Sequence, residues 1–165
     1  MTGPRRLSQA ISEGDGISFI VAVDSAEAAR RAEERGAEAL LASDAAVDAI
    51  RGASALPIVG FAGLAGDACI VSPGDDDVEL RDGVELVVRV EREEELEEAL
   101  ERLDPELFVL AAGPDGDDRL ERVLDLLSDL PAGKLAIADL RDATQPEIEE
   151  LERAGVDAVL VRGLP

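Results

Sequence analysis

The sequence predicts a compact (β/α)₈ barrel of eight parallel strands in which some of the helices are lost. The first observation is that short, β-branched apolar runs alternate along the whole chain with stretches whose apolar residues recur at helical spacing. The second is the length of 165 residues, which gives about 21 residues per strand against about 31 in a typical barrel. A barrel therefore fits only in a shortened form. The alternative is an open, doubly wound sheet of five or six strands.

The eight predicted strands are nearly continuously apolar, as is typical of parallel strands buried on both faces. They cover residues 17–23, 39–42, 57–61, 68–71, 86–90, 107–111, 135–138 and 158–161. Five clear helices are predicted at 25–35, 45–51, 93–103, 117–130 and 145–154, with a weaker one at 6–12. The connections between residues 61 and 68 and between 71 and 86 lack a helical pattern. No linker divides residues 1–165, so we expect a single domain.

Several helix ends are marked by residues that favour caps and stops. Ser25 precedes the first long helix, and Gly36 follows it. The helix at 93–103 places its leucines on one face and its acids on the other. Pro146 lies in the first turn of the last helix, which stops at Gly155.

The composition excludes several classes of function. The chain has 38 acidic and 16 basic residues, a net charge of −22, which argues against nucleic acid and anionic membrane surfaces as partners. It has no histidine, one lysine (Lys134) and one cysteine (Cys69). These shortages remove histidine-based acid–base chemistry, Cys/His zinc sites and disulfides. We therefore expect no metal site and no cofactor.

The acidic excess has two interpretations with about equal support. One is adaptation to a high-salt cytoplasm, where ions screen the self-repulsion of the surface. The other is a GC-rich genome that encodes Arg in place of Lys. No apolar run reaches the length of about 18 residues that a membrane span needs, and no secretory signal is evident, so we expect a cytoplasmic protein.

Several segments, in order along the chain, resemble the indole-3-glycerol-phosphate synthase family. They are R-L-S-Q-A-I at 6–11 with G-I-S-F-I at 16–20, G-A-E-A-L at 36–40, L-P-I-V at 56–59, V-R-V-E at 88–91 with E-E-E-L at 93–96, and A-G-V-D-A-V-L-V at 154–161. The resemblance implies a ribulose-phosphate-binding TIM barrel, with a phosphate site between the last two strands.

The catalytic positions that the resemblance implies have mostly changed. They fall on Ala22, Asp24, Phe61, Arg89, Ala111 and Asp139, where the family has lysines, glutamates and an asparagine. Only the carboxylate at Asp139 survives, and the single lysine precedes the seventh predicted strand. The glycine of the family's last phosphate loop falls on Arg162, with Gly163 next. We infer that the chain lacks the synthase activity.

Polar residues at the carboxyl ends of the predicted strands are the candidate site, because barrel enzymes act there. The candidate catalytic residues are Asp24, Arg89 and Asp139. With Glu91, the two aspartates could form an acid–base pair or a Mg²⁺ site, but solvated rim residues are the favoured interpretation. A buried arginine needs a partner, so Arg89 either holds an anion or pairs with Asp24 or Asp139, and we favour the pair.

The candidate ligand-binding residues are Ser43, Ser72, Arg141, Arg162 and Gly163. The ligand they suggest is phosphate or a small phosphorylated molecule. The alternative is that the two arginines form exposed salt bridges with Asp142 or Glu147.

Three hypotheses about function remain. The first is a non-catalytic or repurposed barrel that binds a small anionic ligand. The second is a lyase or isomerase of a phosphosugar-like substrate that uses Asp24, Arg89 and Asp139. The third is an interaction protein whose faces without helices bury against a second copy or another chain.

Overall fold

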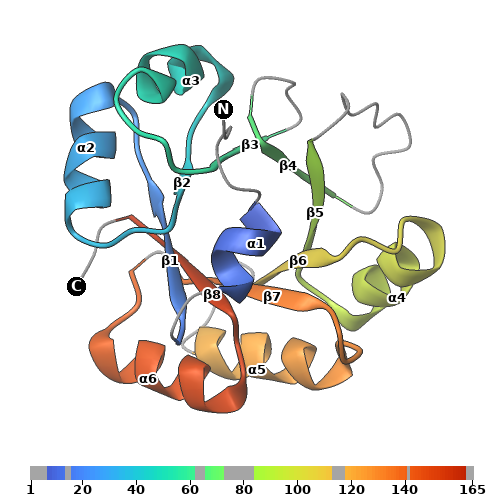
Figure 1. The fold of residues 1–165 in the computed structure, drawn as a ribbon. Coiled ribbons are helices and arrows are strands. Elements are labelled where there is room, and N and C mark those ends of the chain that lie inside the picture. Colours follow the sequence, from blue (N-terminus) through green and yellow to red (C-terminus); the bar gives the residue numbers. More distant parts are fainter. Residues whose placement is uncertain are drawn as a thin grey trace.

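The computed structural model describes residues 7–13, 16–61, 66–72, 84–112, 118–140 and 142–162, with only the backbone of Asp44 and Phe61. Eight parallel strands pair in chain order, and the eighth pairs with the first to close a barrel (Figure 1). The strands are β1 Ser18–Ala22, β2 Ala39–Leu41, β3 Ile58–Phe61, β4 Ala68–Val71, β5 Glu85–Val90, β6 Leu107–Ala111, β7 Leu135–Asp139 and β8 Ala158–Val161. The predicted (β/α)₈ barrel is confirmed, and the open-sheet alternative is wrong.

Helices follow five of the strands and surround much of the barrel. They are α2 Ala26–Glu34, α3 Asp44–Arg51, α4 Glu93–Arg102, α5 Arg119–Asp129 and α6 Gln145–Ala154, preceded by α1 Leu7–Ser12. Around the barrel, α2 packs on α3, and α5 lies between α4 and α6 (Figure 1). Each of the six helices in the described ranges matches a predicted segment. None of the described helices is both long and apolar enough to cross a bilayer.

The predicted cap at Ser25 and the predicted helix stop at Gly155 are both formed. The Ser25 hydroxyl accepts a hydrogen bond from the Ala28 N–H at 3.1 Å. Thr144 and Glu147 form a reciprocal capping box at the start of α6. Gly155 ends this helix in the left-handed conformation, with φ of 102°, which a glycine adopts without steric cost.

Residues 62–67 connect β3 to β4, and the structure describes Gly66 and Asp67 of this connection. The Asp67 N–H donates to the Ile58 carbonyl at 2.7 Å, and the Asp67 carboxylate accepts from the Ile58 N–H at 2.9 Å. Arg51 of α3 contacts the same carboxylate at 2.9 Å. The connection is therefore tied to the start of β3. The second connection without a predicted helix lies mostly outside the described residues.

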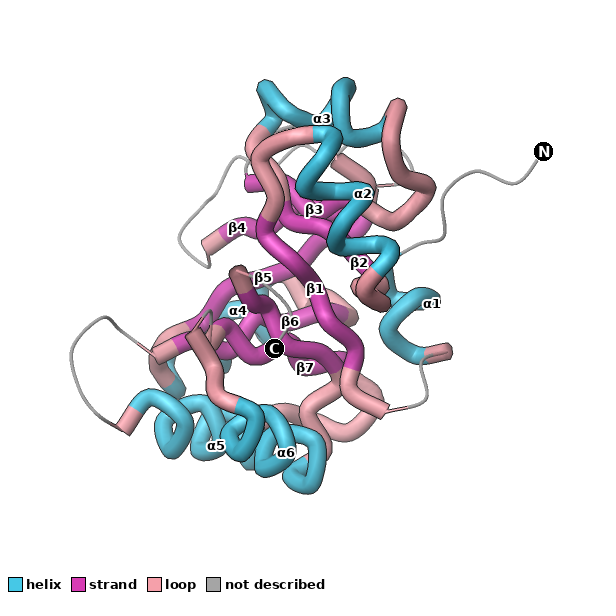
Figure 2. The backbone as a smooth tube through the Cα atoms, turned by 90° about the vertical axis from the view of Figure 1, so that its left-hand side faces the viewer, coloured by secondary structure: helices cyan, strands magenta, loops and turns pink. Residues whose placement is uncertain are grey.

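The core has two layers, one inside the barrel and one between the strands and the helices. Inward-facing residues such as Ile20, Val87 and Ile137 fill the barrel. At the amino ends of the strands, Leu7 and Ile11 of α1 pack on this interior cluster, and Figure 2 shows α1 at one end of the barrel. Because α1 closes that end, a site inside the barrel is reached from the carboxyl ends of the strands.

Candidate functional site

Arg89 and Asp139 lie at the same height on the inner wall of the barrel. In the pairing register, Arg89 is opposite Val109 and Val109 is opposite Ile137. Asp139 therefore lies two residues beyond Ile137, the β7 residue in register with Arg89. A barrel with a shear of 8 rises by about one residue per strand. This rise brings Arg89 on β5 level with Asp139 on β7. The same rule places Ala22 of β1 in this layer of inward-facing positions.

The three side chains of the mouth cluster, Arg89, Asp139 and Glu91, are joined by ion pairs. The Arg89 guanidinium contacts the Asp139 carboxylate directly and lies 3.2 Å from the Glu91 carboxylate. Asp139 is 6% exposed, Arg89 31% and Glu91 41%. One carboxylate of the cluster, Asp139, is therefore buried, and the other, Glu91, is accessible to solvent. Of the two partners considered for Arg89, the structure pairs it with Asp139.

The charged form of Arg89 is stabilised by the two neighbouring carboxylates. Burial opposes the charged form, but hydrogen bonds and Coulombic attraction from Asp139, and then from Glu91, outweigh it and raise the pKa of Arg89. An arginine is already protonated at neutral pH, so Arg89 is a permanent cation. Proton transfer in this cluster can only involve the carboxylates.

Asp24, the third predicted catalytic residue, does not join the cluster. It lies two residues beyond Ala22, after the end of β1, and is exposed to solvent. Within the described residues, no three acidic or thiol side chains gather in a way that could hold a metal ion. Asp24, Glu91 and Asp139 are therefore not brought together as magnesium ligands.

The predicted ligand-binding residues are dispersed. Ser43 is the exposed residue before α3 and makes no side-chain cap, and Ser72 is exposed after β4. Arg162 is exposed after β8, with its Nε 3.7 Å from the Asp142 carboxylate, which is one of the salt bridges weighed from the sequence. Arg141 and Gly163 lie outside the described residues.

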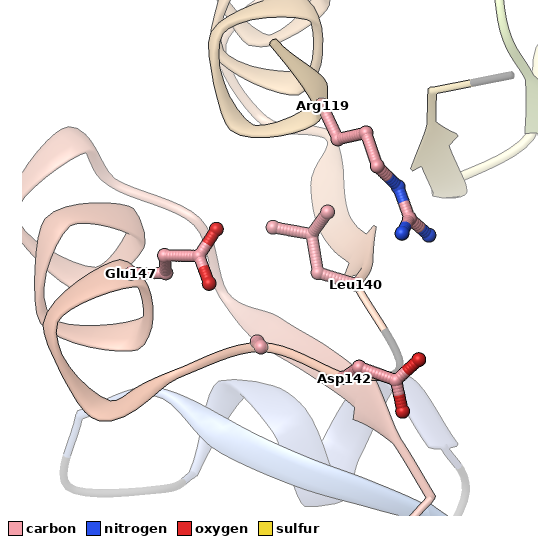
Figure 3. A pocket seen from close by; sticks show the side chains of 5 residues that line it. Arg119, Leu140, Asp142 and Glu147 are labelled. Carbon is pink, nitrogen blue, oxygen red and sulfur yellow. The ribbon is translucent and has the colours of Figure 1, made fainter. Parts of the chain in front are cut away.

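A small pocket lies beyond the end of β7, where α5 and α6 begin. Arg119, Leu140, Asp142, Ala143 and Glu147 line it, and its volume is about 70 Å³. Figure 3 shows Leu140 between Arg119 and Glu147, with Asp142 on the opposite side from the helix α5. That volume holds a few water molecules at most, so this pocket does not accommodate a substrate.

A larger cavity of about 280 Å³ lies where the end of β1, α2 and Arg162 meet. Two of its arginines, Arg31 and Arg35 of α2, were not among the predicted site residues. The available signal was their spacing of four residues beside Ala28 and Ala32, which places small residues and cations on one flank of the helix.

No protein-family model and no curated protein matches the chain, but solved structures share its fold. The N-acetylmannosamine-6-phosphate 2-epimerase of Clostridium perfringens has a TM-score of 0.66 and 14% identity, covering 87% of this chain and 85% of the epimerase. Phosphoenolpyruvate phosphomutase of Streptomyces platensis subsp. rosaceus has a TM-score of 0.67 and 13% identity, covering 93% of this chain and 78% of the mutase.

A third structure, 2,3-dimethylmalate lyase of the PEP mutase/isocitrate lyase superfamily, has a TM-score of 0.62 and 14% identity, covering 94% of this chain and 79% of the lyase. Identities this low establish the fold alone. The closer resemblance to indole-3-glycerol-phosphate synthase stays a prediction. In fold, the chain is a TIM barrel.

Proposed function

We propose that the protein is a lyase or isomerase that acts on a small phosphate-bearing substrate at the carboxyl-end mouth of the barrel. The observation that carries the proposal is the mouth cluster, in which a permanent cation is held between a buried and an exposed carboxylate. This is the end of the fold where TIM-barrel enzymes act. The epimerase, mutase and lyase with the same fold support the reaction class.

The cluster can perform proton abstraction next to a carbonyl, the step shared by many lyases and isomerases. Glu91 is the more exposed carboxylate and can reach a bound substrate as the general base. The electron pair left on carbon moves to the carbonyl oxygen, and the Arg89 guanidinium stabilises the resulting oxyanion. Asp139, buried against Arg89, orients the guanidinium. Return of the proton to a neighbouring carbon gives an isomer.

The proposal is tested by exchange of substrate protons in D₂O. Small phosphosugars and phosphorylated keto acids are incubated with the protein, and deuterium uptake at the carbon next to the carbonyl is followed by NMR. We expect Glu91→Gln to slow the exchange by about 100-fold or more. Glu94→Gln, which removes an equally charged and exposed residue of α4, is the matched control. The proposal would be contradicted if none of the tested compounds took up deuterium, or if both variants lost the exchange activity equally.

A second candidate is a non-catalytic barrel that binds a small anion. It is favoured by the Arg89 guanidinium, a permanent cation that is 31% exposed at the mouth and can contact an anion there. The only lysine, Lys134, does not belong to the mouth cluster, because its Nζ pairs with the Asp104 carboxylate at 2.7 Å. Ligand binding at the mouth without any proton exchange would identify this function.

The third hypothesis, an interaction protein that pairs with a second copy, is tested by the mass in solution. A strict monomer at high protein concentration would exclude self-association.

A further inference from the structure

The cavity of about 280 Å³ beside α2 combines an apolar wall with a cationic rim. The end of β1 and the small residues of α2 form the wall, and three arginines complete the lining. The lining residues are Val21, Ala22, Val23, Ala28, Arg31, Ala32, Arg35 and Arg162. Its volume is just below the range of roughly 300–1,000 Å³ found for small-molecule sites.

The charge of this cavity is opposite to that of the molecule. The chain carries a net charge of −22, yet none of the described residues that line the cavity is acidic. Within the described ranges, neither Arg31 nor Arg35 forms a salt bridge, whereas several other arginines do. Arg162 has only the 3.7 Å contact with Asp142, in which both side chains are largely exposed. The guanidinium groups are therefore available to an external anion.

The arginines come from two distant parts of the chain that the barrel closure brings together. β8 pairs with β1, so Arg162, directly after β8, lies beside the helix that follows β1. On α2, Ala29 and Ala32 are buried, α3 packs on the helix, and Arg31 and Arg35 lie one turn apart at the cavity. Arginines near a helix carboxyl end also stabilise the helix dipole, but this effect does not account for Arg162.

We propose that this cavity binds a dianionic oxyanion, either free phosphate or the phosphate group of a small ester. The guanidinium groups of Arg31, Arg35 and Arg162 hold the phosphate oxygens through charge-assisted hydrogen bonds. The apolar wall of β1 and α2 contacts the organic part of an ester. None of the mouth cluster residues lines this cavity, so the proposal stands independently of the proposed function.

The test is a titration of the full-length, ¹⁵N-labelled protein with inorganic phosphate and with glycerol 1-phosphate at constant ionic strength. We expect NMR shift changes at residues 21–23 and 28–35 and at the side-chain Nε–H groups of the three arginines. The double variant Arg31→Gln/Arg35→Gln should raise the dissociation constant about tenfold. Arg30→Gln, an exposed arginine of the same helix outside the cavity, should change it less than twofold.

Arg162→Gln provides a second variant that leaves α2 intact, so the test holds even if the double variant is destabilised. Tighter binding of the ester identifies an ester as the ligand, and equal affinities identify the free ion. Both results support the site. The proposal is overturned if neither anion shifts these resonances at tens of millimolar, or if Arg30→Gln weakens binding as much as the double variant. Shifts confined to the mouth cluster would also overturn it, while leaving the proposed function standing.

Discussion

At the scale of single residues, Asp139 has the most demanding environment in the mouth. Its side chain is 6% exposed and lies against the guanidinium of Arg89. Removing this cation takes away one partner of the buried carboxylate, so the hydration lost on burial is less well compensated. A buried pair is therefore costly to break from one side, and far less costly to replace as a whole by apolar residues.

We expect Arg89→Met to lower the free energy of unfolding by about 2 kcal/mol. One-sided breakage of a fully buried pair costs roughly 3–5 kcal/mol, and the 31% exposure of Arg89 reduces this. The double variant Arg89→Met/Asp139→Leu should recover most of the loss. Urea denaturation of the two variants measures both values. Unchanged stability of Arg89→Met with loss of a bound ligand would show that the arginine serves binding alone.

Gly66 is a residue at which the backbone closely approaches the backbone of β3. A Cβ atom there would lie 2.9 Å from the Ile58 carbonyl oxygen and 3.1 Å from the Gly60 nitrogen. Both are backbone atoms of β3, so they cannot move aside as a flexible side chain would.

Gly66→Ala should therefore destabilise the protein by about 2 kcal/mol, as expected for overpacking. Gly52→Ala is the matched control, because the nearest atom to its Cβ is 3.5 Å away. Thermal unfolding of both variants measures the difference. Equal melting temperatures would show that the connection before β4 shifts to accept a methyl group.

At the scale of elements, α1 covers the amino-terminal end of the barrel. Leu7 is completely buried and Ile11 is 3% exposed, and both pack on the interior cluster. The Ser8 N–H also donates to the Glu85 carboxylate at 3.2 Å, which links α1 to the start of β5. The helix has six residues, too few to be stable alone, so packing on the barrel keeps it folded.

Leu7→Ala should cost about 3 kcal/mol, within the range for buried Leu to Ala changes. Gln9→Ala, an exposed position of the same helix, should change stability by less than about 0.5 kcal/mol. Chemical denaturation of both variants provides the comparison. A small effect of Leu7→Ala would mean that the barrel is stable without the packing of α1 on its interior.

At the scale of the whole molecule, the net charge of −22 dominates. Self-repulsion of like charges destabilises the compact state, and salt shortens its range from about 30 Å at 0.01 M to about 8 Å at 0.15 M. The described helices that carry acids keep them mostly on exposed faces, as in α4 and α6. The repulsion is therefore spread over the surface.

We expect the melting temperature at pH 7 to rise by several degrees when NaCl is raised from about 0.01 to 0.2 M. The two interpretations of the acidic composition then diverge. A rise that levels off at moderate salt favours a coding bias, whereas a rise that continues above 1 M favours a high-salt cytoplasm. A melting temperature independent of salt would contradict the premise of self-repulsion.

The fold was largely predictable from the sequence, and the site only in part. Strands and helices follow from local patterns, such as the apolar run of β6 and the caps at Ser25 and Gly155. The partner of Arg89 was left open between Asp24 and Asp139, because the choice depends on the shear of the closed barrel. The cavity at Arg31 and Arg35 was missed because Arg162, from the other end of the chain, completes it.

The short return from β3 to β4 also bears on the order of folding. In register, Val59 lies opposite Ala68, whereas Ser18 of β1 lies opposite Ala158 of β8. The entropy of loop closure grows with the logarithm of loop length, so direct closure of the β1–β8 pair costs roughly 2 kcal/mol more than closure of β3–β4. We expect pulse-labelled hydrogen exchange to protect β3 and β4 amides first and β1 and β8 amides last, and simultaneous protection would contradict this order. The arginine-lined cavity would then be assembled only in the final step of folding.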